Sequence, residues 1–330
     1  MKFYVSKCHD KLNGHVYSLE YVAPYICVNP YYNVTIGKGS KCKYMIDSGA
    51  FQDVGNESRL TYQEALNRQL KFEKKISKYK KADAIVSYDR LVDEQMGEAG
   101  QFKERVPMDI AKSYVEETIK AAEFLDGCRS KLGTRKLILS CQGVNADQYI
   151  QCLENILNVS KEGDIIGFGG FCIMSKSIEY EKQYYDVIKR AFPLIKKEGI
   201  NRVHIFGVGI FRALIQTDVF ARMNGLECSY DTSSPEINAT YGKVFNPMTP
   251  GLTSVYSKVH KKNGYTPADI ALFNVKMINE FWKLHETIPL PDVFEPDLVP
   301  RKKKDVEELY RAALGKNVET DEEVNIPIDE

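Results

Sequence analysis

The sequence predicts an α/β protein: a TIM-type (β/α) barrel with an irregular N-terminal segment and a C-terminal helical extension. Short apolar runs alternate with longer stretches of helical periodicity, which is typical of parallel strands joined by helical crossovers. Six such runs lie between residues 43 and 231, and the first 42 residues leave room for more, which favours a closed barrel over an open sheet. The 330 residues are enough for one large barrel.

Each predicted strand is apolar and ends in a polar or glycine position. In a barrel of this type the active site gathers residues from the carboxyl ends of several strands. These strand ends are therefore the first candidates for a functional site. The predicted strands are KYMID (43–47), DAIVSYD (83–89), KLILSCQG (136–143), DIIGFGG (164–170), RVHIFGVG (202–209) and LECSYD (226–231).

Three predicted helices have recognisable ends. TYQE at 61–64 fits a capping box, with Thr61 as the N-cap and Glu64 reaching back. Asn145 is placed to cap a second helix, and Gly199 suits the C-terminal stop of a third over 178–200. Apolar residues at helical spacing follow the first two caps: Phe72, Ile76 and Tyr79, and then Tyr149, Leu153 and Ile156.

Composition limits the class of protein. Lys+Arg and Asp+Glu both number 45, so the formal net charge is zero, which excludes a polycation but leaves room for a local basic patch. We expect one barrel domain over 1–290, and over 291–330 an extension with a short helix and an acidic tail.

The cysteines and the N-terminus predict a cytoplasmic protein without a membrane partner. The eight cysteines are scattered with no C-x-x-C pair, which favours reduced thiols. The first residues, MKFYVSKCHDK, lack the apolar region of a signal peptide. No apolar run approaches the roughly 20 residues that a membrane span requires.

Three aspartates stand at the ends of predicted strands: Asp47, Asp89 and Asp231. Like charges that converge in a partly desolvated site raise one another's pKa, and such an arrangement is common where acid–base or nucleophilic chemistry takes place. A single aspartate at such a position could equally cap the helix that follows. Three at three strand ends favour a catalytic site.

Six segments together resemble the tRNA-guanine transglycosylases, in the order in which that family has them. DSGAFQ (47–52) is similar to D-S-G-G-F-Q, with Ala50 in place of the second glycine, and AIVSYD is similar to the strand whose aspartate reads the guanine edge. SCQG resembles V-Q-G, IIGFGGF resembles I-G-G-L, and FGVG resembles M-G-V-G. GLECSYDTSS resembles G-V-D-M-F-D-C-V, whose last aspartate is the nucleophile.

The resemblance implies roles for individual residues. Asp231 would attack C1′ of the target nucleotide and form a covalent ester, while Asp47 would act as general acid and base, as in a retaining glycosidase. Asp89 and Gln142 would bind the purine edge together with backbone groups. Tyr88 and Phe51 are candidates to stack on the purine, although either could be a core residue. The remaining predicted substrate contacts are Ser48, Gln52, Gly143, Gly169, Gly170, Gly207 and Gly209.

The chain departs from the tRNA enzymes after the nucleophile. Their C-x-C-x-x-C zinc motif is missing, because no cysteine follows Cys228 and only His260 and His285 remain downstream. Their arginine-bearing stretch is replaced by SSPEINATYGKVFN (233–246). The pattern instead resembles the phage-type 7-deazaguanine DNA transglycosylases. We therefore expect neither metal nor cofactor, a place in the host cytoplasm if the chain is phage-encoded, and protection of DNA from restriction as the outcome.

The predicted reaction replaces guanine in DNA with free 7-cyano-7-deazaguanine or a relative. Residues 59–81 carry eight Lys and Arg against two Glu, a surplus suited to phosphate contacts, and basic clusters at 256–265 and 301–304 add to it. Solvated helix faces would explain each cluster equally well. The alternatives are an enzyme acting on tRNA, a catalytically silent nucleic-acid-binding homologue, and a glycoside hydrolase, which the single tryptophan, Trp282, disfavours.

Overall fold

The protein is described by a computed structural model that covers residues 1–54, 59–95, 102–172, 174, 177–246, 251–254, 263–296 and 298. The predicted short helix and acidic tail of the C-terminal extension, the basic cluster at 301–304 and most of the cluster at 256–265 lie outside the described residues. The division near residue 290 thus stays a prediction.

The predicted TIM-type barrel is confirmed. Eight parallel strands pair with their neighbours in chain order, and the last pairs with the first to close the ring. The six predicted runs supply six strands, and the N-terminal segment supplies the other two. The barrel strands are β1 (Lys2–Lys7), β4 (Tyr25–Val28), β5 (Lys43–Ile46), β6 (Ala84–Val86), β9 (Lys136–Cys141), β10 (Ile165–Phe168), β11 (Arg202–Ile205) and β12 (Glu227–Thr232).

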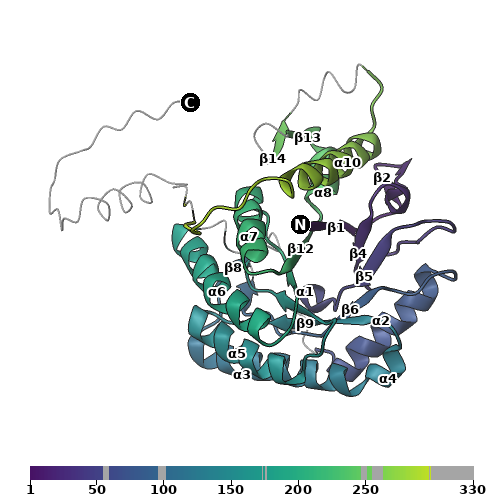
Figure 1. Ribbon diagram of the computed structural model, residues 1–330. Coiled ribbons are helices and arrows are strands. Elements are labelled where there is room, and N and C mark those ends of the chain that lie inside the picture. Colours follow the sequence, from purple (N-terminus) through teal and green to yellow (C-terminus); the bar gives the residue numbers. More distant parts are fainter. Residues whose placement is uncertain are drawn as a thin grey trace.

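Helices surround the ring of strands (Figure 1). Between the later strands stand α2 (Tyr62–Ile76), α3 (Met108–Gly127), α4 (Arg129–Leu132), α5 (Ala146–Val159), α6 (Ile178–Lys197) and α7 (Phe211–Met223). After β12 follow α8 (Ser234–Thr240) and α10 (Pro267–His285), and α10 packs against β1 and α8. The helix α1 (Ala50–Asp53) is a single turn at the end of β5.

The N-terminal part of the barrel is irregular, as predicted. Between β1 and β4 the chain forms only the ribbon of β2 (Lys11–Leu12) and β3 (His15–Val16) and the 3₁₀ turn η1 (Leu19–Tyr21). Two further antiparallel ribbons follow barrel strands: β7 (Asp93–Gln95) with β8 (Phe102–Arg105), and β13 (Lys243–Asn246) with β14 (Gly251–Ser254). None of the helices in the described ranges is long and apolar enough to cross a membrane.

The predicted helix ends are largely confirmed. Thr61 and Glu64 form the capping box of α2, and the Asn145 side chain accepts from the backbone N–H of Gln148 at the start of α5. Gly199 has φ 78°, and its N–H donates to the Lys196 carbonyl just beyond α6. The place of Tyr79 was predicted wrongly, because α2 already ends at Ile76 and Tyr79 is 66% exposed.

The core of the described residues has two main parts, beside a small cluster of Val92, Val106 and Ala111. The larger lies between the barrel and its helices, and the smaller fills the barrel interior with Tyr4, Cys27, Met45, Ala84, Val86, Ile138 and Ile165. Cys27 and Val86 also line the cavity described below, so the top of the interior cluster is the floor of that cavity.

Candidate active site

A cavity of about 370 Å³ opens at the carboxyl ends of the strands, and all eight barrel strands, or the residues directly after them, contribute to its wall. Ten of the predicted site residues line it together, although they come from five separate parts of the chain. They are Asp47, Ser48, Phe51, Gln52, Asp89, Gly169, Gly170, Gly207, Gly209 and Asp231.

Asp47 follows β5 and is held by two hydrogen bonds. Its Oδ2 accepts from the Asn29 side-chain amide at 2.6 Å, and its Oδ1 accepts from the backbone N–H of Ser48 at 2.8 Å. Burial, and then the charges of Asp231 and Asp89, raise the pKa of Asp47 to about 7. A carboxyl group with such a pKa can both donate and accept a proton near neutral pH.

Asp231, in β12, accepts at both carboxylate oxygens. The Ser6 hydroxyl donates to Oδ2 at 3.0 Å, and Nε2 of His204 lies 3.3 Å from Oδ1. The ring is fixed from its other side, where Nδ1 lies 2.9 Å from the Ser229 hydroxyl. Because an ionised carboxylate can only accept, Nε2 must carry a proton for this contact to stabilise Asp231. With 18% of its side chain exposed, Asp231 remains accessible from the cavity.

Asp89 is joined to Asp47 through Ser48. Its Oδ1 accepts from the Ser48 hydroxyl at 3.3 Å, and its Oδ2 accepts from the Gln142 amide at 2.5 Å. Burial raises the pKa of Asp89 to about 6. Gln142 is fully buried behind Asp89, and its Oε1 has no hydrogen-bond partner among the described residues.

Two glycines at the end of β10 allow this close packing. A Cβ on Gly169 would lie 2.3 Å from Nε2 of Gln142, and Gly170 has φ 74°. Gly143 is also required by packing, since a Cβ there would lie 2.7 Å from the backbone nitrogen of Tyr149. Gly143 and Gln142 do not line the cavity, so the structure places them behind its wall.

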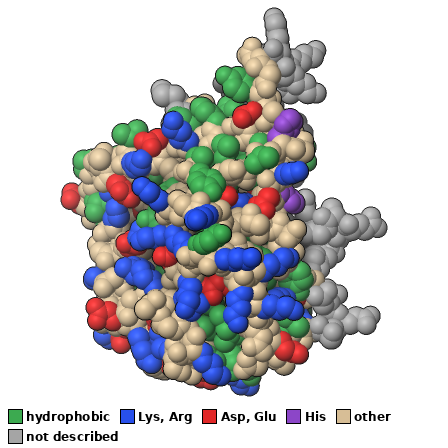
Figure 2. All heavy atoms as spheres, turned by 90° about the vertical axis from the view of Figure 1, so that its right-hand side faces the viewer, with side chains coloured by type: hydrophobic (Ala, Val, Ile, Leu, Met, Phe, Trp, Pro, Cys, Tyr) green, Lys and Arg blue, Asp and Glu red, His purple; other side chains and the backbone are tan. Residues whose placement is uncertain are grey.

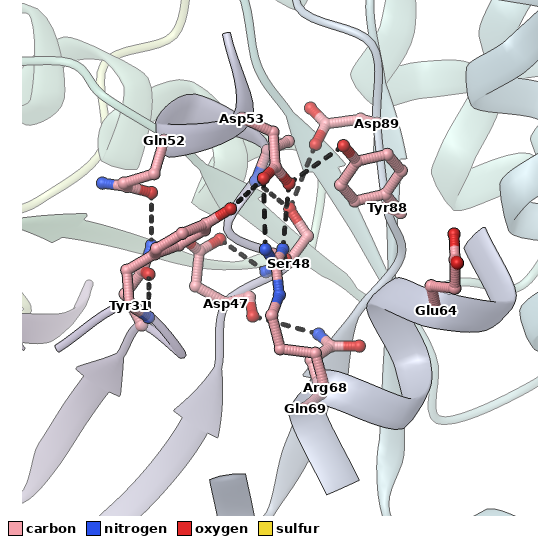
Figure 3. A network of polar contacts seen from close by, with 12 residues as sticks. Tyr31, Asp47, Ser48, Gln52, Asp53, Glu64, Arg68, Gln69, Tyr88 and Asp89 are labelled. Atoms are coloured by element: carbon pink, nitrogen blue, oxygen red, sulfur yellow. Dashed lines mark hydrogen bonds and ion pairs between the residues drawn. The ribbon is translucent and has the colours of Figure 1, made fainter. Parts of the chain in front are cut away.

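The turn that carries Asp47 is fixed by a buried ion pair at Asp53 (Figure 3). Arg68 of α2 donates from Nη2 to Asp53 at 3.0 Å and to the Ser48 carbonyl at 2.6 Å. Tyr31 and Tyr88 approach Asp53 from either side, and the Tyr88 hydroxyl donates to it at 2.9 Å. Tyr88 therefore supports the turn and does not line the cavity.

Phe51, in the same turn, lies at the cavity mouth and is 45% exposed. Its partner in the turn, Gln52, accepts from Asn29 at 2.8 Å, so one asparagine links Gln52 to Asp47. Below the turn, Nε2 of Gln69 lies within 3.3 Å of the carbonyls of Ile46 and Asp47 at the end of β5 and of Val86 in β6.

The residues that hold the aspartates and the end of β5 include four that were not predicted: Ser6, Asn29, Gln69 and His204. Ser6 and Asp231 are 225 positions apart, and Asn29 and Asp47 are 18 apart. Nothing local to a serine or an asparagine indicates such a contact. His204 lies within the predicted strand 202–209, and its polar side chain in an apolar run was the one available signal.

The basic residues at 59–81 divide between two ends of the barrel. Arg59 and Arg68 lie at the mouth end of α2, where Arg68 pairs with Asp53. The lysines from Lys71 to Lys81 lie toward the start of β5, where the Tyr44 hydroxyl donates to the Lys80 carbonyl at 2.8 Å. They therefore do not surround the cavity.

No protein-family model matches the chain, and no curated protein matches it. The resemblance to transglycosylases thus rests on the six sequence segments. Within the part of the chain that the structure describes, no group of three or more His, Cys, Asp or Glu side chains is placed to hold a metal ion.

Proposed function

We propose that the chain is a base-exchange pentosyltransferase that replaces guanine in DNA with a 7-deazaguanine through a covalent aspartyl-glycosyl intermediate. The observation that carries the proposal is the pair of carboxylates in one cavity. Asp47 has a pKa raised to about 7, whereas Asp231 is held at both carboxylate oxygens, by Ser6 and His204. Such a pair provides an acid and a nucleophile at the same pH.

In the first half-reaction a carboxylate oxygen of Asp231 forms a bond to C1′ of the target nucleotide. The bond from C1′ to N9 breaks, its electron pair goes to the base, and Asp47 gives its proton to the departing guanine. The resulting ester keeps the sugar activated, because a carboxylate is a good leaving group. The cavity volume of about 370 Å³ is in the range of small-ligand pockets.

In the second half-reaction the incoming 7-deazaguanine attacks C1′ with its ring nitrogen and loses the proton of that nitrogen to Asp47. The ester bond breaks, and Asp231 recovers its charge, stabilised by the donors Ser6 and His204. Both carboxyl groups return to their initial states, so the cycle needs neither metal nor redox cofactor.

Recognition of the base is assigned to Asp89 and the backbone of Gly169 and Gly170, which line the cavity. Gln142 orients Asp89 from behind. A buried polar edge of this kind discriminates strongly, because a base without the matching groups would leave the acceptor capacity of Asp89 that Ser48 and Gln142 do not use without a donor. The choice of DNA rests on the sequence after Asp231, where the zinc motif and the arginine-bearing stretch of the tRNA enzymes are missing.

The deciding experiment offers radiolabelled guanine and a panel of 7-deazaguanines to duplex DNA, single-stranded DNA and unmodified tRNA. We expect incorporation into DNA and none with Asp231→Asn. Incorporation into tRNA alone would identify the RNA enzyme, and exchange by Asp231→Asn at the normal rate would contradict the proposed nucleophile. Wild-type protein that binds DNA but exchanges no base on any substrate would identify the silent homologue.

A further inference from the structure

One side of the barrel carries a concentration of exposed lysines. Figure 2 shows Lys and Arg side chains spread over this side of the molecule. We call the following residues the lysine face; all are exposed and lie on the segment that leads into β5, at the first residue of β5, on the second half of α2 or directly after α2: Lys38, Lys41, Lys43, Lys71, Lys74, Lys75, Lys78 and Lys81.

The two segments of the lysine face lie side by side. The backbone N–H of Ile36 donates to the Ile76 carbonyl at 2.9 Å, and the Lys80 ammonium donates to the Cys42 carbonyl. Nζ of Lys38 lies 5.7 Å from the ring centre of Tyr79. The eight lysines therefore form one continuous surface.

Two acidic residues beside this surface are buried and already paired. Glu73 is buried and pairs with Arg135 at 2.5 Å, and Glu20 is buried and pairs with Lys7 at 2.6 Å. Among the described residues, none of the eight lysines forms an ion pair. In a chain of zero formal net charge, the lysine face is thus a local excess of positive charge.

We propose that the lysine face is a second, separate contact site for the phosphate backbone of a polynucleotide whose target nucleotide enters the cavity. Lys71, Lys74 and Lys75 recur at i, i+3 and i+4 on α2, so they form a row about 6 Å long at 1.5 Å per residue, and Lys78 follows two residues after the helix ends. The row on α2 faces about two phosphates of one strand at 3.4 Å each. Lysine contacts phosphate as a point charge, which suits backbone contacts that are independent of sequence.

This inference rests on the proposed function, which supplies the polynucleotide as the partner. The position of the lysine face predicts that binding affinity depends on the length of the polynucleotide. The helix α2 has 15 residues from the mouth end at Tyr62 to Ile76, which is about 22 Å. A polynucleotide that reaches both the cavity and the lysine row must therefore extend over roughly 6 nucleotides at 3.4 Å each. Shorter oligonucleotides would contact the mouth alone.

The test compares two variants of the whole chain. The first carries Lys71→Gln, Lys74→Gln, Lys75→Gln and Lys78→Gln, because glutamine keeps helix propensity and removes the charge. The matched control carries four exposed lysines of other helices changed in the same way: Lys112, Lys120, Lys197 and Lys276. Affinity is measured from 50 to 200 mM salt for labelled 30-nucleotide single-stranded DNA, a 30-base-pair duplex and a 4-nucleotide single strand.

We expect the first variant to bind at least one 30-residue probe about tenfold or more weakly at low salt, with a log–log salt slope reduced by about 3. The control variant should bind as the wild type does, and the 4-nucleotide probe should be bound equally by all three proteins. Equal affinity and slope of both variants for both 30-residue probes would overturn the proposal. So would loss of binding to phosphatidylserine vesicles by the first variant with unchanged DNA binding.

The outcomes separate this inference from the proposed function. DNA binding through the lysine face without base exchange would support this inference and contradict the proposed function. Base exchange on long DNA with unchanged kcat/KM in the first variant would keep the function and overturn the inference.

Discussion

The raised pKa of Asp47 predicts that a charge-removing substitution stabilises the protein at alkaline pH. The carboxyl group has a model-compound pKa of 3.8 and a folded-state pKa of about 7. Between these values the folded state binds more protons than the unfolded state, so its stability falls as the pH rises through this window. The Asn side chain of Asp47→Asn does not titrate, so the stability of this variant should lack the fall with rising pH that Asp47 causes.

The size of the effect follows from the shift. About three pKa units at 1.36 kcal/mol each correspond to about 4 kcal/mol at high pH, of which about 2.5 kcal/mol develops between pH 5 and pH 8. The Asp47 side chain lines an open cavity, and water there halves this estimate to about 1 kcal/mol. The substitution also replaces the acceptor of the Asn29 amide, which costs about 1 kcal/mol at every pH.

The assay is urea unfolding of Asp47→Asn and the wild type at pH 5 and pH 8. From pH 5 to pH 8, we expect the free energy of unfolding of the variant to rise by about 1 to 2.5 kcal/mol relative to that of the wild type. The control is Asp186→Asn, which removes one charge from a side chain that is 57% exposed and should show no such gain. An identical stability difference between Asp47→Asn and the wild type at both pH values would refute the raised pKa.

Three further predictions concern the reaction. Guanine release in a single turnover should slow as the pH rises through about 7, because Asp47 must be protonated, and a pH-independent rate would contradict its role. His204→Phe should lower kcat about 10- to 100-fold with little change in KM, and Ser229→Ala should lower it less; equal kcat in all three proteins would exclude positioning through this pair. Arg68→Lys should raise KM about tenfold, since it loses a bidentate pair with the buried Asp53, and retention of wild-type KM would exclude that support.

The sequence predicts the barrel well because its signals are local. Each of the later strands is a short apolar run between helical segments, and Thr61, Asn145 and Gly199 mark helix ends through contacts with residues no more than four positions away. The first two strands could not be delimited, because only a ribbon and a 3₁₀ turn separate them, without the helix that marks the crossovers after β5. Tyr79 had the helical spacing, but α2 ends before it at Ile76.

The residues of the candidate site also fall into those that the sequence predicts and those that it does not. Asp47, Asp89 and Asp231 were predicted to lie together because each stands at the carboxyl end of a strand. All parallel strands of a barrel end at the same edge, and the three aspartates do line one cavity. The side chains that hold these carboxylates come from other strands and helices and could not be predicted. Ser6 and His204 illustrate this, since their contact with Asp231 exists only once the barrel closes.

The two aspartates are also coupled, which explains how one carboxyl group can serve as acid and then as base. After burial, the charge of Asp231 is the largest contribution to the raised pKa of Asp47. Ester formation removes that charge, so the pKa of Asp47 should fall just after it has given up its proton, and it should rise again as Asp231 leaves and the incoming base needs a proton acceptor. The coupling is measurable without substrate: in an Asp231→Asn background, the pH-dependent gain from Asp47→Asn should shrink. An undiminished gain would mean that burial alone raises the pKa of Asp47, and the alternation between acid and base would then need another cause.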